Sequence, residues 1–230
     1  MPDVIIYLGP SLLPAEAEKI LPADPATEYR PPVRRGDLIH AIAASPSIIG
    51  IIDGLFFESA SVGHREILSA LKAGIQVVGA SSMGALRAAE LETFGMVGVG
   101  EVFRRYRDGE IESDDEVALI CDPISNAALS EALINIRITL EKAVREDILT
   151  HEESGVLFTT ARSLYYPDRT YNQIIRSADI REEKRDEFRA WITTNRVDQK
   201  QSDARSALEY IRNIRNNDGD ERNARIPERT

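Results

Sequence analysis

The chain has 230 residues, 43% of them hydrophobic, and its formal net charge is −10. This length and apolar content predict one globular domain, or one domain with a small appendage. The acidic balance argues against a nucleic-acid-binding protein, which needs a clustered basic face. With one cysteine and three scattered histidines, neither a disulfide framework nor a zinc site is expected, and we expect no other metal or cofactor. No apolar run approaches the roughly 20 residues of a membrane span, and no basic signal-peptide region opens the chain, so a cytoplasmic location is expected.

Strand-like and helix-like patterns alternate over the first 122 residues. Continuous apolar runs predict buried strands at 4–9, 47–54, 75–80 and, more weakly, 115–121. Helical patterns follow the first three runs, whereas the proline-rich segment 22–37 predicts a long loop. Short strands that are apolar on both faces and alternate with helices indicate an α/β fold, with a small parallel sheet flanked by helices.

From residue 123 the pattern becomes entirely helical. Amphipathic segments predict helices near 124–146, 150–166, 170–178, 180–193 and 201–214. The second of these opens with Thr150 and Glu153, the pair typical of a capping box. We therefore expect an α/β core domain over 1–122, a helical region over 123–214 and a disordered tail over 215–230, which is charged and rich in helix breakers.

Polar residues follow three of the predicted strands. Parallel sheets bind ligands at the carboxyl ends of their strands, so the segments after these strands should meet at one edge. The segments are Gly9-Pro10-Ser11, Asp53-Gly54 and Ala80-Ser81-Ser82-Met83-Gly84. His64 begins the helix predicted after the second strand, and we expect it at the same edge.

The segment from Ala80 to Gly84 has the pattern small-x-Ser-x-Gly centred on Ser82. It is similar to a nucleophile elbow, in which small flanking residues let a strained turn expose the serine Oγ. Free N–H groups at the start of the following helix could also hold an oxyanion or a carboxylate. The alternative, more common in proteins, is that Ser81 only caps the helix.

His64 could act as the general base for the serine, with Asp53 orienting its ring. The alternative is a surface histidine that pairs with Glu58 or Glu66. Composition alone does not separate these two possibilities.

Arg87 and Glu90 are three residues apart on the predicted helix after the serines. Arg87 could bind an anionic group of a substrate, or the two residues could form an ordinary helical ion pair. The glycines in residues 95–100 suggest a tight turn but do not form a dinucleotide-binding fingerprint, and no lysine follows to make a P-loop.

Several long motifs resemble those of the TfuA family. They are Gly-Ala-Ser-Ser-Met-Gly-Ala-x-Arg-Ala-Ala-Glu at 79–90, Gly-Met-x-Gly-x-Gly at 95–100, Asp-Asp-Glu-Val at 114–117 and Asn-Ile-Arg at 135–137. The resemblance runs from about residue 53 to residue 140, and residues 150–230 carry no motif that we can place.

The resemblance implies a partner of YcaO enzymes, which activate a backbone amide with ATP, in the formation of peptide thioamides. The implied role is to accept a ubiquitin-like sulfur-carrier protein with a C-terminal thiocarboxylate, hydrolyse it and pass sulfide to the YcaO protein. The alternative is a non-catalytic subunit that docks to a YcaO enzyme or activates it. For the hydrolase we expect Ser82, His64 and Asp53 to be catalytic, and Arg87, Ser81, Gly84 and Gly54 to bind the substrate.

Overall fold

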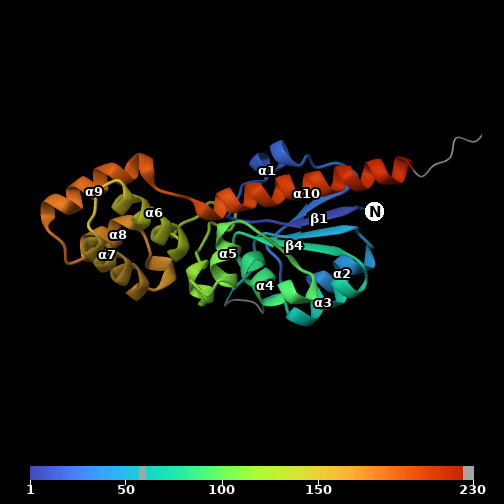
Figure 1. Ribbon diagram of the computed structural model, residues 1–230, viewed down its shortest axis with the longest axis horizontal. Coiled ribbons are helices and arrows are strands. Elements are labelled where there is room, and N and C mark those ends of the chain that lie inside the picture. Colours follow the sequence, from blue (N-terminus) through green and yellow to red (C-terminus); the bar gives the residue numbers. More distant parts are fainter. Residues whose placement is uncertain (57–60, 225–230) are drawn as a thin grey trace, which may run out of the picture. The chain divides into compact units, whose positions relative to one another are not determined.

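A computed structural model describes residues 1–56 and 61–224, with side chains described up to residue 217 (Figure 1). Contacts divide the chain into two compact units. The first unit combines Met1–Arg107 with the segment from Gln201 onward, and the second is Asp108–Lys200. The first unit is therefore discontinuous in sequence, which the expected division at residue 122 did not anticipate.

The first unit contains a five-stranded parallel sheet in the order β2-β1-β3-β4-β5. The strands are β1 (Val4–Tyr7), β2 (Thr27–Arg30), β3 (Ile48–Ile51), β4 (Gln76–Ala80) and β5 (Val97–Val99). The predictions of an α/β fold with a parallel sheet, and of strands β1, β3 and β4, are confirmed. These three strands form the centre of the sheet, where both faces are covered and the sequence is continuously apolar.

The two edge strands differ from the expectations. β2 lies within the segment predicted to be a loop, because its residues pair with β1 despite the prolines on either side. β5 lies in the glycine-rich segment predicted to be a tight turn, and it pairs with β4. The strand predicted at 115–121 is wrong: this segment holds a 3-10 turn (Asp114–Glu116) and a single bridge at Cys121, in the second unit.

Helices cover both faces of the sheet (Figure 1). One face packs against α1 (Pro14–Ile20) and α10 (Gln199–Ala224). The other face lies on the side of α2 (Asp37–Ala43), α3 (His64–Lys72), α4 (Met83–Leu91) and α5 (Glu101–Arg107). The result is a three-layer arrangement with the sheet between two layers of helices.

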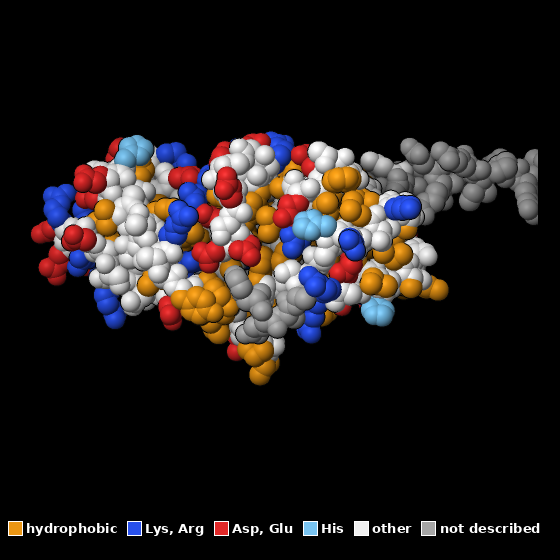
Figure 2. Space-filling model, turned by 90° about the horizontal axis from the view of Figure 1, so that it is seen from below, with side chains coloured by type: hydrophobic (Ala, Val, Ile, Leu, Met, Phe, Trp, Pro, Cys, Tyr) orange, Lys and Arg blue, Asp and Glu red, His pale blue; other side chains and the backbone are white. Residues whose placement is uncertain are grey.

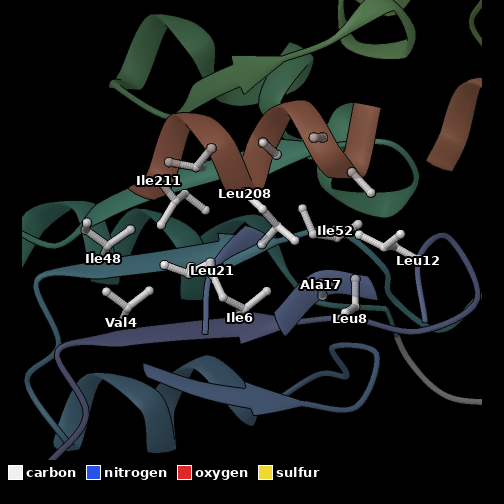
Figure 3. Close-up of a cluster of buried hydrophobic side chains, with 14 residues drawn as sticks. Val4, Ile6, Leu8, Leu12, Ala17, Leu21, Ile48, Ile52, Leu208 and Ile211 are labelled. Atoms are coloured by element: carbon white, nitrogen blue, oxygen red, sulfur yellow. The ribbon is translucent and has the colours of Figure 1, made fainter. Parts of the chain in front are cut away.

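Helix α10 adds residues to this core that lie far along the sequence from the strands (Figure 3). Its Leu208 and Ile211 pack into the cluster that contains Val4, Ile6 and Ile48. Gly50 makes the approach possible, because a Cβ atom there would lie 2.8 Å from Ile211 Cδ1. Residues 215–224, expected to be disordered, continue this helix. The side chain of Arg215 anchors that part by donating to Asp24 and Thr27 at the start of β2.

The second unit is built around α6 (Leu133–Arg145), α7 (His151–Ser163), α8 (Tyr171–Ser177) and α9 (Glu182–Asn195). Their apolar sides form one cluster, and Thr150 with Glu153 forms the predicted capping box of α7. The predicted helices are thus present, although α6 begins nine residues later than the predicted 124. No helix in the described part of the chain is long and apolar enough to cross a membrane.

Candidate functional site

The strand register aligns four residues in one row at the carboxyl edge of the sheet. Tyr7 pairs with Ile51, Ile51 with Gly79, and Ala80 with Val99. Extending each strand past its last pair in this register places four residues side by side, one at the end of each of β1, β3, β4 and β5. These residues are Gly9, Asp53, Ser81 and Gly100. Neighbouring strands lie about 4.8 Å apart, so the polar residues expected at this edge do come together there.

The strand order reverses direction between β1 and β3. Doubly wound sheets bind ligands at the carboxyl edge beside this switch point. Asp53 lies there, at the end of β3, and is 2% exposed. Its carboxylate accepts hydrogen bonds from Gly9 N–H (2.9 Å), Ser11 N–H (3.1 Å) and Ser11 Oγ (2.6 Å). Asp53 therefore orders the loop after β1.

Ser81 occupies a strained turn at the end of β4. Its φ is +67°, a region that residues with a Cβ atom rarely adopt. Ser82 N–H donates to Ala80 O at 2.7 Å across it, which is the hydrogen bond of a γ-turn. Backbone strain of this kind is found at functional sites and is the feature that defines a nucleophile elbow. The sequence pattern centres on Ser82, but the strained residue is Ser81.

Ser82 occupies the N-cap position of α4, and its side chain makes no capping hydrogen bond. Ser82, and not Ser81, is therefore the N-cap residue of α4. In the described part of the chain, Met83 N–H at the first helical position has no hydrogen-bond acceptor. Ser81 and Ser82 are 0% and 2% exposed, so a substrate can reach them only if segments at this edge move apart.

Gly54 and Gly84 have packing roles that the sequence did not reveal. A Cβ atom on Gly84 would lie 1.7 Å from Ile51 O, and one on Gly54 would lie 2.7 Å from Met83 Cγ. The space beside both glycines is thus filled by the protein itself. This packing brings the start of α4 against the end of β3, which holds the serine turn beside Asp53.

His64 and Arg87 meet at Glu90, which the sequence does not single out as a site residue. Glu90 Oε2 accepts from His64 Nε2 at 2.7 Å and from Arg87 Nη1 at 2.6 Å. Arg87 Nε also donates to Val62 O at 3.1 Å. The spacing of Arg87 and Glu90 predicted their ion pair, whereas no local pattern connects either with His64. Basic, acidic and histidine side chains adjoin on the face seen in Figure 2.

His64 pairs with neither Asp53 nor Glu66, the described residues that the sequence offered as its partners. His64 pairs with Glu90, while Asp53 holds the loop after β1, so Asp53 does not orient His64. Of the alternative partners of His64, Glu66 accepts from Gly36 and Gly63 N–H instead, and Glu58 lies outside the described residues. Glu90 is seven residues after Met83, about 10 Å along α4 at 1.5 Å per residue. The imidazole is thus held by Glu90, a residue two turns further along α4 than Met83.

Two further motifs pair with each other inside the second unit. Glu116 of Asp-Asp-Glu-Val accepts from Arg137 of Asn-Ile-Arg at 2.5 Å, and Asp115 accepts from the buried Arg169 at 2.8 Å. Asn135 Oδ1 accepts the N–H groups of Gln199 and Lys200 at the start of α10. These residues hold the second unit together.

The fold and this edge define a class of protein: a doubly wound parallel α/β protein whose polar strand ends, a strained serine and a buried carboxylate lie where such folds bind ligands. Within that class, the family described as TfuA-like protein matches residues 53–170. The chain belongs to the TfuA-like family. The match begins at Asp53 and includes the serine turn and the paired motifs of the second unit. A search of curated proteins found no match.

Proposed function

We propose that this protein hydrolyses the C-terminal thiocarboxylate of a ubiquitin-like sulfur carrier and supplies the sulfide to a YcaO enzyme for peptide thioamidation. The reaction is R–COS⁻ + H₂O → R–COO⁻ + H₂S. The strained turn at Ser81, inside the family's longest motif, is the observation that carries the proposal. A strained, buried serine beside a carboxylate is suited to acyl transfer.

The proposed chemistry has two steps. In the first, Ser81 Oγ attacks the thiocarboxylate carbon, the carbon–sulfur bond breaks, and the serine proton leaves with sulfur as HS⁻. In the second, water hydrolyses the acyl-serine ester, which returns the serine hydroxyl and forms the carboxylate with release of one proton. Asp53, in the same row, is the proposed carrier of the proton between serine and sulfur. Met83 N–H is the proposed donor to the oxyanion.

Measuring sulfide release by the isolated protein tests the proposal. Wild-type protein and the variants Ser81→Ala and Ser82→Ala are incubated with the thiocarboxylated carrier, and sulfide and carrier mass are followed over time. We expect release by the wild type and a loss of at least 10³-fold in Ser81→Ala, because removal of a nucleophile abolishes the chemical step. Ser82→Ala should retain most of the activity.

Two other outcomes reassign the function. If Ser82→Ala loses activity and Ser81→Ala retains it, the nucleophile is Ser82, as the sequence pattern first indicated. If the isolated protein releases no sulfide but stimulates thioamide formation by the YcaO enzyme supplied with free sulfide, the protein is a non-catalytic docking or activating subunit.

A further inference from the structure

The lysine and arginine side chains described in the first unit fall into two groups. Most of them donate to a carboxylate or a backbone carbonyl, or lie over an aromatic ring. The described side chains of this unit that have no such partner are Arg34, Arg35, Arg65 and Lys72, all exposed.

Three of these four cations lie at the carboxyl edge of the sheet. Arg34 and Arg35 are in the loop that leaves β2, and Arg65 is in the first turn of α3. Lys72 lies at the other end of α3, where the chain returns to the amino end of β4. The unpartnered positive charge is therefore concentrated at the edge that carries Asp53 and Ser81.

Backbone hydrogen bonds hold the arginine loop against the site. Val33 N–H donates to Asp53 O at 2.9 Å, and Leu55 N–H donates to Val33 O at 3.1 Å. On the other side, Gly36 N–H donates to Glu66 Oε2 at 2.7 Å, which ties the loop to the first turn of α3. Arg34 and Arg35 thus extend from a segment whose position is set by β3 and α3.

The nearby carboxylates leave these guanidinium groups unpaired because they bind backbone N–H groups instead. Asp37 accepts from Arg34 N–H at 2.8 Å, Glu66 accepts from Gly36 and Gly63, and Asp53 accepts from the loop after β1. Arg87, which we had expected to bind an anion, already donates to Glu90 and to Val62 O. Among the described cationic side chains at this edge, Arg34, Arg35 and Arg65 remain able to bind an anion.

We propose that Arg34, Arg35 and Arg65 form a docking surface for an acidic patch of the sulfur-carrier protein next to its reactive C-terminus. The inference rests on the proposed function, which supplies the identity of the partner. Guanidinium groups bind carboxylates through two parallel hydrogen bonds. Three exposed arginines at one edge of an otherwise acidic protein also help to orient an acidic partner there, although Asp37 and Glu66 keep their negative charges beside them.

Binding of the carrier in its ordinary carboxylate form tests the surface without any chemical step. Isothermal titration calorimetry at 50 mM and 300 mM salt compares the wild type with Arg34→Glu/Arg35→Glu and with Lys72→Glu. The double charge reversal should weaken binding at least tenfold at low salt, and less at high salt, because surface charges are screened. Lys72→Glu, which reverses an exposed cation at the other end of the sheet, should stay within twofold. Arg34→Lys/Arg35→Lys should weaken binding by about threefold or more, but less than the charge reversal, because lysine keeps the charge and loses the two parallel hydrogen bonds.

The outcomes separate this inference from the proposed function. Equal affinities of Arg34→Glu/Arg35→Glu and Lys72→Glu, with unchanged circular dichroism, overturn the docking surface even if the wild type releases sulfide. Conversely, selective loss of binding in Arg34→Glu/Arg35→Glu supports the surface even if the wild type releases none, in which case only the hydrolase proposal fails. Absence of carrier binding by the wild type overturns the docking surface.

Discussion

Replacing Ser81 by glycine should make the first unit more stable than replacing it by alanine. Both variants remove the Oγ atom and its interactions, so their comparison leaves only the Cβ atom and the freedom of the backbone. At a φ of +67° the Cβ atom is strained, and glycine relieves this strain. In most folded positions, by contrast, alanine is the more stable of the two.

The expected difference follows from two opposing effects. A residue with a Cβ atom in the left-handed region costs about 1–2 kcal/mol, which Ser81→Gly recovers and Ser81→Ala does not. Glycine adds about 0.4–1 kcal/mol of backbone freedom to the unfolded chain. Ser81→Gly should therefore exceed Ser81→Ala in free energy of unfolding by about 1 kcal/mol, while both variants lose sulfide release.

Urea denaturation followed by circular dichroism measures this difference. Ser69, a serine inside α3, provides the matched control, since alanine is favoured over glycine by about 1 kcal/mol in a helix. The sign of the glycine-minus-alanine difference should therefore be opposite at the two positions. The same sign at both would refute the strained turn and, with it, the structural basis for placing the nucleophile at Ser81.

Two further predictions concern packing and burial. Gly84→Ala should lower the free energy of unfolding by about 2–3 kcal/mol, because its Cβ atom would meet Ile51 O. Gly155, in α7, has open space around it, so Gly155→Ala should raise the free energy of unfolding by about 1 kcal/mol. Equal effects of the two variants in urea denaturation would contradict this packing. Burial raises the pKa of Glu131, whose carboxylate accepts from Asn135, so the stability it contributes is present below the ordinary pKa of the carboxyl and is lost as pH rises through the raised one. Glu131→Gln stays neutral, so its free energy of unfolding should rise relative to that of the wild type between pH 4.5 and pH 7. A difference that does not change with pH would show that ionisation of Glu131 does not destabilise the fold.

The centre of the sheet was predictable because its strands are apolar on both faces. The edge strands were not, for different reasons. Thr27–Arg30 consists of three polar residues and one tyrosine between prolines, and only its pairing with β1 makes it a strand. Val97–Val99 contains a glycine and is three residues long, so nothing local marks it. The apolar residues at 115–121 are the converse case: Val117 and Ala118 are buried, but in an irregular segment.

The meeting of Asp53 and the serine turn at one edge of the sheet was predictable, but their hydrogen-bond partners were not. The rule that parallel strands end at one edge placed Asp53 and the serines together. Which serine is strained depends on where β4 ends, and helix and strand boundaries are the least certain features of a sequence. The partners of Asp53 and His64 are 42–44 and 26 residues away, and no periodicity connects residues at such separations.

The return of α10 to the sheet has a consequence for synthesis. Leu208 and Ile211 cover apolar residues of β1 and β3, yet residues 108–200 are made between these partners. At roughly 5–20 residues per second, synthesis of this segment takes roughly 5–20 seconds, and during that time one face of the sheet has no covering helix. Throughout that interval the nascent chain exposes an apolar surface that chaperones can bind, and a ribosome that stops before residue 208 releases a protein whose sheet stays open to aggregation.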